Sequence, residues 1–215
     1  SAAFGALSHA TGTYSTALGG TTVARGSYRS AGGFEATASG GNASAFGAHS
    51  TASGGNSTAL CIGANAAGTY STALGHFSHT AAIDDVAIGS SAYSVGTRST
   101  ALGTLASANG NQSVAVGGNA NAHGVQAFAL GSSAQATANN TTAIGGAIDL
   151  NGDGTIQANE QTRASAGLAL ALGDASQATQ TNASALGAEA DATGVGATAV
   201  GSTSVASGLA AATLG

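Results

Sequence analysis

Large apolar residues recur along this chain at every fourteenth position, with two interruptions, and each is followed by glycine or, once, by cysteine. Counting from Gly5 in steps of 14 reaches sixteen positions, ending at Gly215, of which fourteen are glycine. The exceptions are Cys61 and Asn159, and the residue before the counted position is Leu, Ile, Val or Phe in fourteen of the sixteen cases. Such regular phasing indicates an internal structural repeat.

A second glycine often lies seven positions before the first, as at Gly12 and Gly54. Because glycine reaches positive φ at little cost, two glycines in each period predict two tight turns. Between them lie short segments, such as 14–18 and 119–123, in which side chains alternate as they do in strands. The sequence therefore predicts an all-β fold, a parallel β-roll or solenoid of 14-residue coils stacked on one another.

The interior of such a coil is thin, since one large apolar residue and several alanines are all that it offers. A fully buried leucine contributes roughly 1.5–3 kcal/mol, whereas ordering the backbone costs roughly 1–2 kcal/mol per residue. In the recurring Ser-Thr-Ala-Leu-Gly strand, both alternating faces carry small or apolar side chains. We therefore expect an oligomer in which the alanine-rich strand faces pack at or near its axis.

The composition removes several functional classes. Charged residues are 6% of the chain, the net charge is −5, and there is no lysine. Four dispersed arginines and a negative net charge argue against nucleic acid as a partner. No apolar stretch reaches the roughly 18 residues of a membrane-spanning helix, and no signal peptide is visible. The repeat is already in phase at both ends, so residues 1–215 are interpreted as a fragment of a longer chain.

Several segments resemble a known family. Residues 113–117 (Ser-Val-Ala-Val-Gly), residues 142–145 (Thr-Ala-Ile-Gly) and residues 119–124 (Asn-Ala-Asn-Ala-His-Gly) are similar to head repeats of trimeric autotransporter adhesins of the YadA type. The resemblance implies a left-handed β-roll, a homotrimer, and a virulence-associated head on the bacterial cell surface, anchored in the outer membrane by a separate domain. It implies host extracellular matrix or host-cell receptors as partners, and no enzymatic activity.

The resemblance is interrupted at residues 146–163, where the spacing from Gly145 to Gly173 is twice the usual period. Residues 149–160 match the calcium-loop pattern D-x-[DN]-x-[DN]-G-x5-E, which places hard oxygen ligands at alternate positions around the ion. The alternative is an acidic protruding loop without a metal. The prediction is an EF-hand-like Ca²⁺ site of weak affinity, with ligands from Asp149, Asn151, Asp153, Thr155 (carbonyl), Gln157 and Glu160.

Other solenoid functions fit less well. Ice binding needs a regular threonine array, and the threonine column is broken by residues such as Val86 and Phe128. An acyltransferase needs six-residue phasing, which is absent. A purely structural surface spacer stays open as an alternative to adhesion. Two local departures from the repeat are interpreted as structural rather than functional features. Asp84-Asp85 is interpreted as a solvated turn, and Cys61 as a small buried residue.

Overall fold

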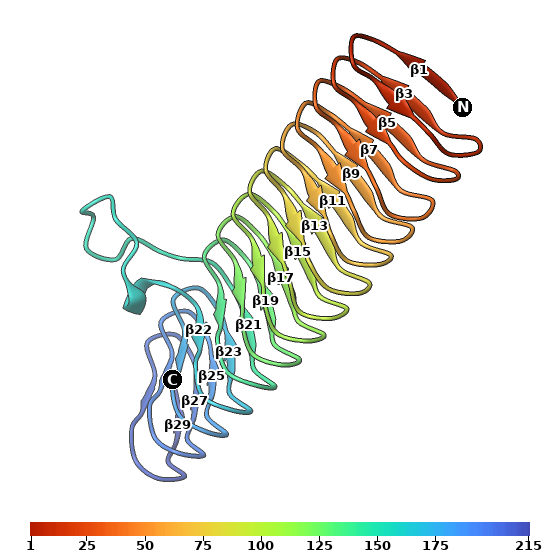
Figure 1. Cartoon of the computed structure of the whole chain (residues 1–215). Helices are drawn as coiled ribbons and strands as arrows, with labels where there is room; N and C mark the ends of the chain where they lie inside the picture. Colours follow the sequence, from red (N-terminus) through yellow and green to blue (C-terminus); the bar gives the residue numbers. More distant parts are fainter. The chain divides into compact units, whose positions relative to one another are not determined.

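A computed structural model describes all 215 residues, which form two compact units, Ser1–Leu105 and Ala106–Gly215. Both units consist of very short parallel strands joined by turns, with each coil spanning one period of the sequence repeat (Figure 1). The one helical element is a single 3₁₀ turn, η1 (Ala158–Glu160). No helix has the length and apolar character needed to cross a membrane. The predicted all-β parallel solenoid is therefore confirmed.

In the first unit, three-residue strands form one parallel sheet, here called the long-strand sheet, and two-residue strands form a second, the short-strand sheet. The long-strand sheet contains β1 (Ala2–Phe4), β3 (Thr16–Leu18), β5 (Ser30–Gly32), β7 (Ser44–Phe46), β9 (Thr58–Leu60), β11 (Thr72–Leu74), β13 (Val86–Ile88) and β15 (Thr100–Leu102). The short-strand sheet contains β2 (His9–Ala10), β4 (Val23–Ala24), β6 (Thr37–Ala38), β8 (Thr51–Ala52), β10 (Asn65–Ala66), β12 (His79–Thr80) and β14 (Tyr93–Ser94).

The second unit repeats this arrangement. Its long-strand sheet contains β17 (Val114–Val116), β19 (Phe128–Leu130), β21 (Thr142–Ile144), β23 (Leu170–Leu172), β25 (Ser184–Leu186), β27 (Thr198–Val200) and β29 (Ala212–Leu214). Its short-strand sheet contains β16 (Ser107–Ala108), β18 (Asn121–Ala122), β20 (Gln135–Ala136), β22 (Arg163–Ala164), β24 (Gln177–Ala178), β26 (Asp191–Ala192) and β28 (Val205–Ala206). Each residue pairs with its equivalent in the next coil.

Alanine fills the interior of each coil. The central residue of the long strands, as in Ala17, Ala73 and Ala129, is fully buried within the single chain. The two sheets can lie close together because most of the side chains between them are no larger than the methyl group of alanine. The expectation that alanine-rich faces pack at an oligomer axis is therefore wrong, because the roll itself buries those faces.

The large apolar residues lie on the opposite, outer face of each long-strand sheet. In the second unit Leu130 and Leu172 keep 38% and 43% of their surface exposed, and in the first unit Leu18 and Leu102 keep 44% and 42%. We call this column the apolar stripe. It comprises Phe4, Leu18, Phe46, Leu60, Leu74, Ile88 and Leu102 in the first unit, and Val116, Leu130, Ile144, Leu172, Leu186, Val200 and Leu214 in the second.

The first unit has one gap in its stripe, at Gly32, where other coils carry a large apolar residue. A Cβ atom on Gly32 would lie 2.7 Å from Cδ1 of Phe46, so the Phe46 ring of the next coil occupies that space. The aromatic side chain therefore closes the gap that the glycine leaves.

The turns use positive φ mainly at residues other than glycine. The counted glycines do adopt it, as at Gly19 (126°), but twenty-five non-glycine residues have φ between 51 and 62°. One is Glu35, whose amide donates to the Gly20 carbonyl of the preceding coil at 3.0 Å. The second glycine of a period is needed for close approach instead, since a Cβ on Gly54 would lie 1.9 Å from the Gly68 oxygen.

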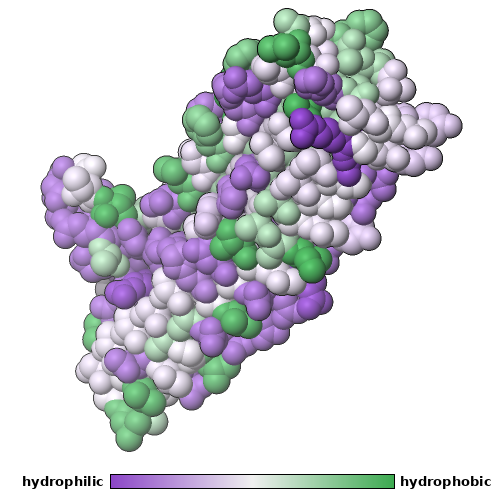
Figure 2. All heavy atoms as spheres, in the orientation of Figure 1, coloured by the Kyte–Doolittle hydropathy of each residue, from purple (hydrophilic) through white to green (hydrophobic).

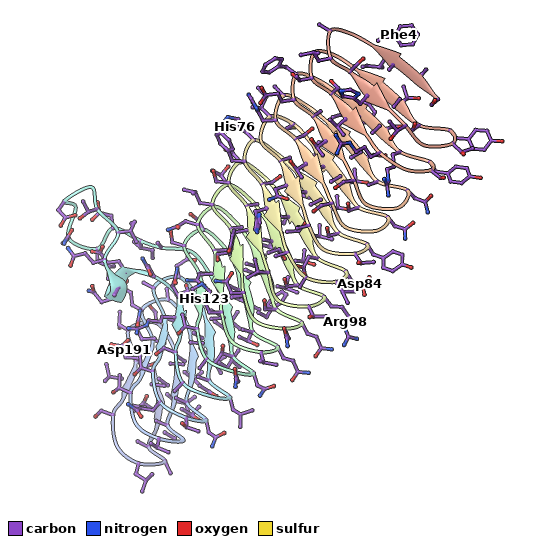
Figure 3. The ribbon with its side chains drawn as sticks, in the orientation of Figure 1. Phe4, His76, Asp84, Arg98, His123 and Asp191 are labelled. Atoms are coloured by element: carbon purple, nitrogen blue, oxygen red, sulfur yellow. The ribbon has the colours of Figure 1, made fainter.

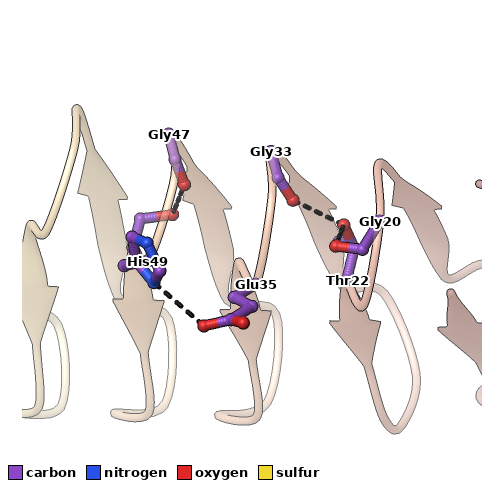
Figure 4. A network of polar contacts seen from close by, with 7 residues as sticks. Gly20, Thr22, Gly33, Glu35, Gly47 and His49 are labelled. Carbon is purple, nitrogen blue, oxygen red and sulfur yellow. Dashed lines mark hydrogen bonds and ion pairs between the residues drawn. The ribbon is translucent and has the colours of Figure 1, made fainter. Parts of the chain in front are cut away.

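Buried hydroxyl groups satisfy turn carbonyls inside the roll. Thr22 Oγ1 donates to the Gly33 carbonyl oxygen at 2.5 Å, and Ser50 Oγ donates to the Gly47 carbonyl oxygen at 2.8 Å (Figure 4). On the outside of the same coils, His49 Nδ1 lies 3.0 Å from a Glu35 carboxylate oxygen. The serines and threonines thus supply the hydrogen bonds that an alanine interior cannot.

One interior position carries a carboxylate. Asp85 is fully buried at a position that is serine in the neighbouring coils, at Ser71 and Ser99. It accepts hydrogen bonds from the Ala82 amide at 2.7 Å and from the Ser99 amide at 3.3 Å. Burial raises the pKa of this carboxyl above its usual value. The solvated-turn interpretation therefore holds for the exposed Asp84 but is wrong for Asp85.

Candidate functional site

The insertion projects from the second unit between β21 and β22 (Figure 1). An isolated antiparallel bridge between Ala147 and Gln161 closes its neck. The fully buried Thr162 hydroxyl donates to the carbonyls of Gly146 at 2.8 Å and Gly173 at 2.7 Å. The roll resumes in register after the loop, since Thr142 pairs with Leu170 across twice the usual period.

Glu160 anchors the inside of the loop. Its side chain is 1% exposed, and Oε1 accepts from the amides of Leu150 at 3.1 Å and Asn151 at 3.3 Å. Oε2 accepts from the Gln157 amide at 2.8 Å, which forms a capping box for η1. The last predicted ligand therefore lies against both ends of the loop and holds them together.

Asp149 and Asp153 bind loop amides on the exposed side. Asp149 accepts from the amides of Gly152 at 2.7 Å and Gly154 at 2.9 Å. Asp153 Oδ1 accepts from the Thr155 hydroxyl at 2.5 Å and the Thr155 amide at 2.8 Å. These bonds to Thr155 hold the pKa of the Asp153 carboxyl below its usual value.

The two amide side chains complete the ring of the predicted ligands. Asn151 Nδ2 and Gln157 Nε2 each donate to Asp153 Oδ2 at 3.0 Å, and Asn151 Oδ1 accepts from the Asp153 amide at 2.9 Å. All six predicted ligands thus lie within one compact loop of hard oxygen donors, which is the donor chemistry that calcium prefers. The structure holds no cluster of three His, Cys, Asp or Glu side chains positioned around a common metal position, so an ion would have to draw the carboxylates away from the loop amides.

The surface of the loop is mainly hydrophilic with some hydrophobic side chains among it (Figure 2). Leu150 and Ile156 are 44% and 42% exposed. Gln177 of β24 ties the loop to the roll, because its Nε2 donates to the carbonyls of Ala158 at 3.2 Å and Gln161 at 2.6 Å. Sequence reasoning missed Gln177, which lies outside the insertion.

The edges of the first unit present ladders of exposed side chains. The rings of Tyr14 and Tyr28 stack with centroids 5.2 Å apart, and Asn42 donates to Asn56 at 3.0 Å. Further along the same column Asp84 and Arg98 point outward (Figure 3). These side chains repeat once per coil, which is the arrangement expected of a repetitive display surface.

The remaining candidate features are isolated. Cys61 is exposed and has φ 98°, so its interpretation as a small buried residue is wrong. On the outer face of the long-strand sheet Thr72 pairs with Val86, so threonine forms no continuous array there. Neither feature supplies a second functional site.

Comparison with known families identifies the repeat. The family described as the YadA head domain repeat matches residues 1–22, 31–60, 62–92, 94–120, 122–147, 164–190 and 192–211. The matches stop at the neck of the insertion and resume at β22, so the predicted calcium loop lies outside the family pattern. No curated protein sequence matches the chain. The family matches cover well over half of the sequence, so the chain belongs to the YadA head family.

Proposed function

We propose that this chain is the head of a non-enzymatic, homotrimeric adhesin, which attaches bacteria to host extracellular matrix or to host-cell receptors. Membership in the YadA head family supports an extracellular position at the cell surface. In this proposal a separate domain anchors the head in the outer membrane, and each roll is left-handed.

The apolar stripe is the observation that supports a trimer. Several of its leucines are about 40% exposed in the single chain, with Leu18, Leu102 and Leu130 at 44%, 42% and 38%. Every coil but one contributes a large apolar residue to the stripe, whereas monomeric proteins seldom expose a contiguous apolar surface of such extent. Packing three outer faces of the long-strand sheets against one another would remove that surface from water. The trimer would leave the short-strand sheets facing outward for contact with a host.

We further propose that the insertion binds one calcium ion through the six predicted ligands from Asp149 to Glu160. Their oxygen chemistry supports this role, and binding would exchange amide hydrogen bonds of the carboxylates, such as that from Gln157 to Glu160, for contacts with the ion. An isolated loop with three carboxylates suits an affinity of the order of 10⁻⁴–10⁻³ M, as in extracellular modules. Calcium at extracellular concentration would then stabilise the loop by mass action.

Solid-phase binding of the purified head to collagen, fibronectin, laminin and whole host cells tests adhesion. We expect saturable binding by the trimer to at least one of these surfaces, and much weaker binding by a dissociated form, because trimeric display adds avidity. A matched control is a surface coated with albumin. Absence of binding to every host surface would contradict adhesion and favour a structural spacer.

A further inference from the structure

An open groove of ≈ 290 Å³ runs between the insertion and the outside of the roll in the second unit. The insertion supplies one wall through Leu150 and Asn159. The opposite side comes from two columns of residues one period apart, which place one turn residue and one short-strand residue of each coil next to the groove. Those columns are Ala175, Glu189 and Thr203, and Gln177, Asp191 and Val205.

The wall is held in place by polar contacts. Gln177 is 8% exposed and donates to two carbonyls of the insertion, and the fully buried Thr162 hydroxyl closes the neck. Leu150 and Val205 are 44% and 56% exposed, so apolar surface flanks the polar floor. The groove is thus a built feature with a mixed apolar and acidic lining.

Glu189 and Asp191 lie in this groove without a protein cation. The single ion pair in the structure joins His49 to Glu35, in the first unit. No hydrogen-bond donor approaches either carboxylate side chain. Partial burial, and next the neighbouring Glu189 charge, raise the pKa of the Asp191 carboxyl. Two carboxylates that disfavour each other's charge are stabilised by a cation that reaches both.

The charge of the molecule is concentrated around this groove. The first unit contains three acidic residues and three arginines, whereas the second contains six acidic residues and one arginine, so the whole net charge of −5 falls in the second unit. All six acidic residues lie between positions 149 and 191, in the insertion and the coils that line the groove. A field of this sign attracts a cationic partner and speeds its encounter.

We infer that this groove is a docking site for an arginine- or lysine-bearing segment of a partner protein. The aliphatic stem of the basic side chain packs against Leu150 and Val205, and its charged head reaches Glu189 and Asp191. Arginine suits the site because its planar group can bind two carboxylate oxygens at once. This inference rests on the proposed adhesive function, since it names the chemistry that the head would recognise. The apolar stripe lies on the other sheet, so the proposed trimer leaves the groove open.

Titration calorimetry with the purified head tests this site. The probe is a blocked hexapeptide in which arginine and leucine alternate, and its control carries citrulline, which is uncharged and nearly isosteric, in place of arginine. We expect the citrulline peptide and the variant Glu189→Gln with Asp191→Asn each to weaken binding by about tenfold, because an interfacial charge pair is lost. The matched variant Glu35→Gln with Asp84→Asn removes two charges in the first unit and should change binding less than about twofold.

Equal weakening by both double variants would overturn the inference, because binding would then follow net charge rather than the groove. Equal binding of the two peptides, or no binding of either, would also overturn it. Unchanged melting temperatures and sedimentation of the variants establish that they fold. Adhesion to host surfaces is measured separately on the same proteins. Arginine-specific binding by a head that fails to adhere would refute the adhesive function and support the groove as a docking site. Adhesion without peptide binding would support the adhesive function and refute the docking site.

Discussion

Replacing Leu130 with aspartate should dissociate the proposed trimer while leaving much of the single roll folded. Leu130 lies in the apolar stripe, paired with Val116 on one side and Ile144 on the other. It is 38% exposed, so the chain alone already buries about three fifths of its surface. Loss of that burial costs about 1–2 kcal/mol per chain.

The cost in a trimer is larger. The rest of the Leu130 side chain would be buried against the other copies, and the substitution would place three carboxylates at one level of the interface. Each ion removed from water without a partner costs several kcal/mol, even after the surrounding protein relaxes. Dissociation relieves all three at once. We therefore expect Leu130→Asp to sediment as a monomer at micromolar concentration and to melt well below the native protein.

The matched control is Tyr93→Asp. Tyr93 is 43% exposed and lies on the outer face of the short-strand sheet, where it stacks on His79 with centroids 5.1 Å apart. A similar loss of burial therefore occurs on the face that we do not assign to the interface. This variant should stay trimeric. A trimeric Leu130→Asp protein with near-native melting would refute the assignment of the stripe, and dissociation by Tyr93→Asp would place the interface on the other sheet.

Three further predictions concern single coils and the insertion. Gly32→Leu should lower the unfolding free energy by about 1–3 kcal/mol through its clash with Phe46, and thermal melts should show most of this recovered when Phe46→Leu is added; an equal cost in both backgrounds would contradict the packing. Asp85 has a raised folded-state pKa, so its stabilising contribution is fully present below the unfolded pKa of about 4 and is lost as pH rises through the folded value. Asp85→Ser should therefore raise the free energy of unfolding more at neutral pH than at acid pH, as measured by denaturant titrations. A stability difference between the variant and the native protein that does not change with pH would argue against this. Asp149→Ala with Asp153→Ala should abolish the heat of calcium binding with nearly unchanged melting; heat retained at millimolar calcium would place the ion elsewhere.

The repeat length, the strand positions and the phase after the insertion were all predictable, because glycine and leucine recur at fixed intervals. The environment of each strand face was not. Alternation divides side chains into two sets but does not say which set is inside. We expected burial of the alanine faces between chains, yet Ala73 is fully enclosed and Leu74 is 36% exposed. The thinness of the coil was the available signal, since two facing sheets joined by such short turns have room only for small side chains.

Turn conformation was harder to read from residue types. Glycine marked the turns, but the residue with φ near 58° is Tyr14, Leu105 or Gln126 in individual coils. Such residues carry a conformational cost of about 1–2 kcal/mol in this region. Stacking offsets it in most coils, because the amide of the turn residue donates to the coil before it, as Gln126 does to Asn111 at 2.9 Å. The constraint is imposed by neighbouring coils, and therefore residue preference at one position does not reveal it.

The groove shows where sequence reasoning could have gone further. In a solenoid, residues one period apart become neighbours, so Gln177, Asp191 and Val205 form a predictable column on the outside of the short-strand sheet. The insertion was also predictable from the doubled spacing. The direction in which the insertion folds was not, because it depends on two hydrogen bonds from Gln177 to carbonyls of the loop. A side chain that the repeat leaves free to vary thus helps to hold the loop against the acidic coils, where Glu189 and Asp191 line the groove beside it.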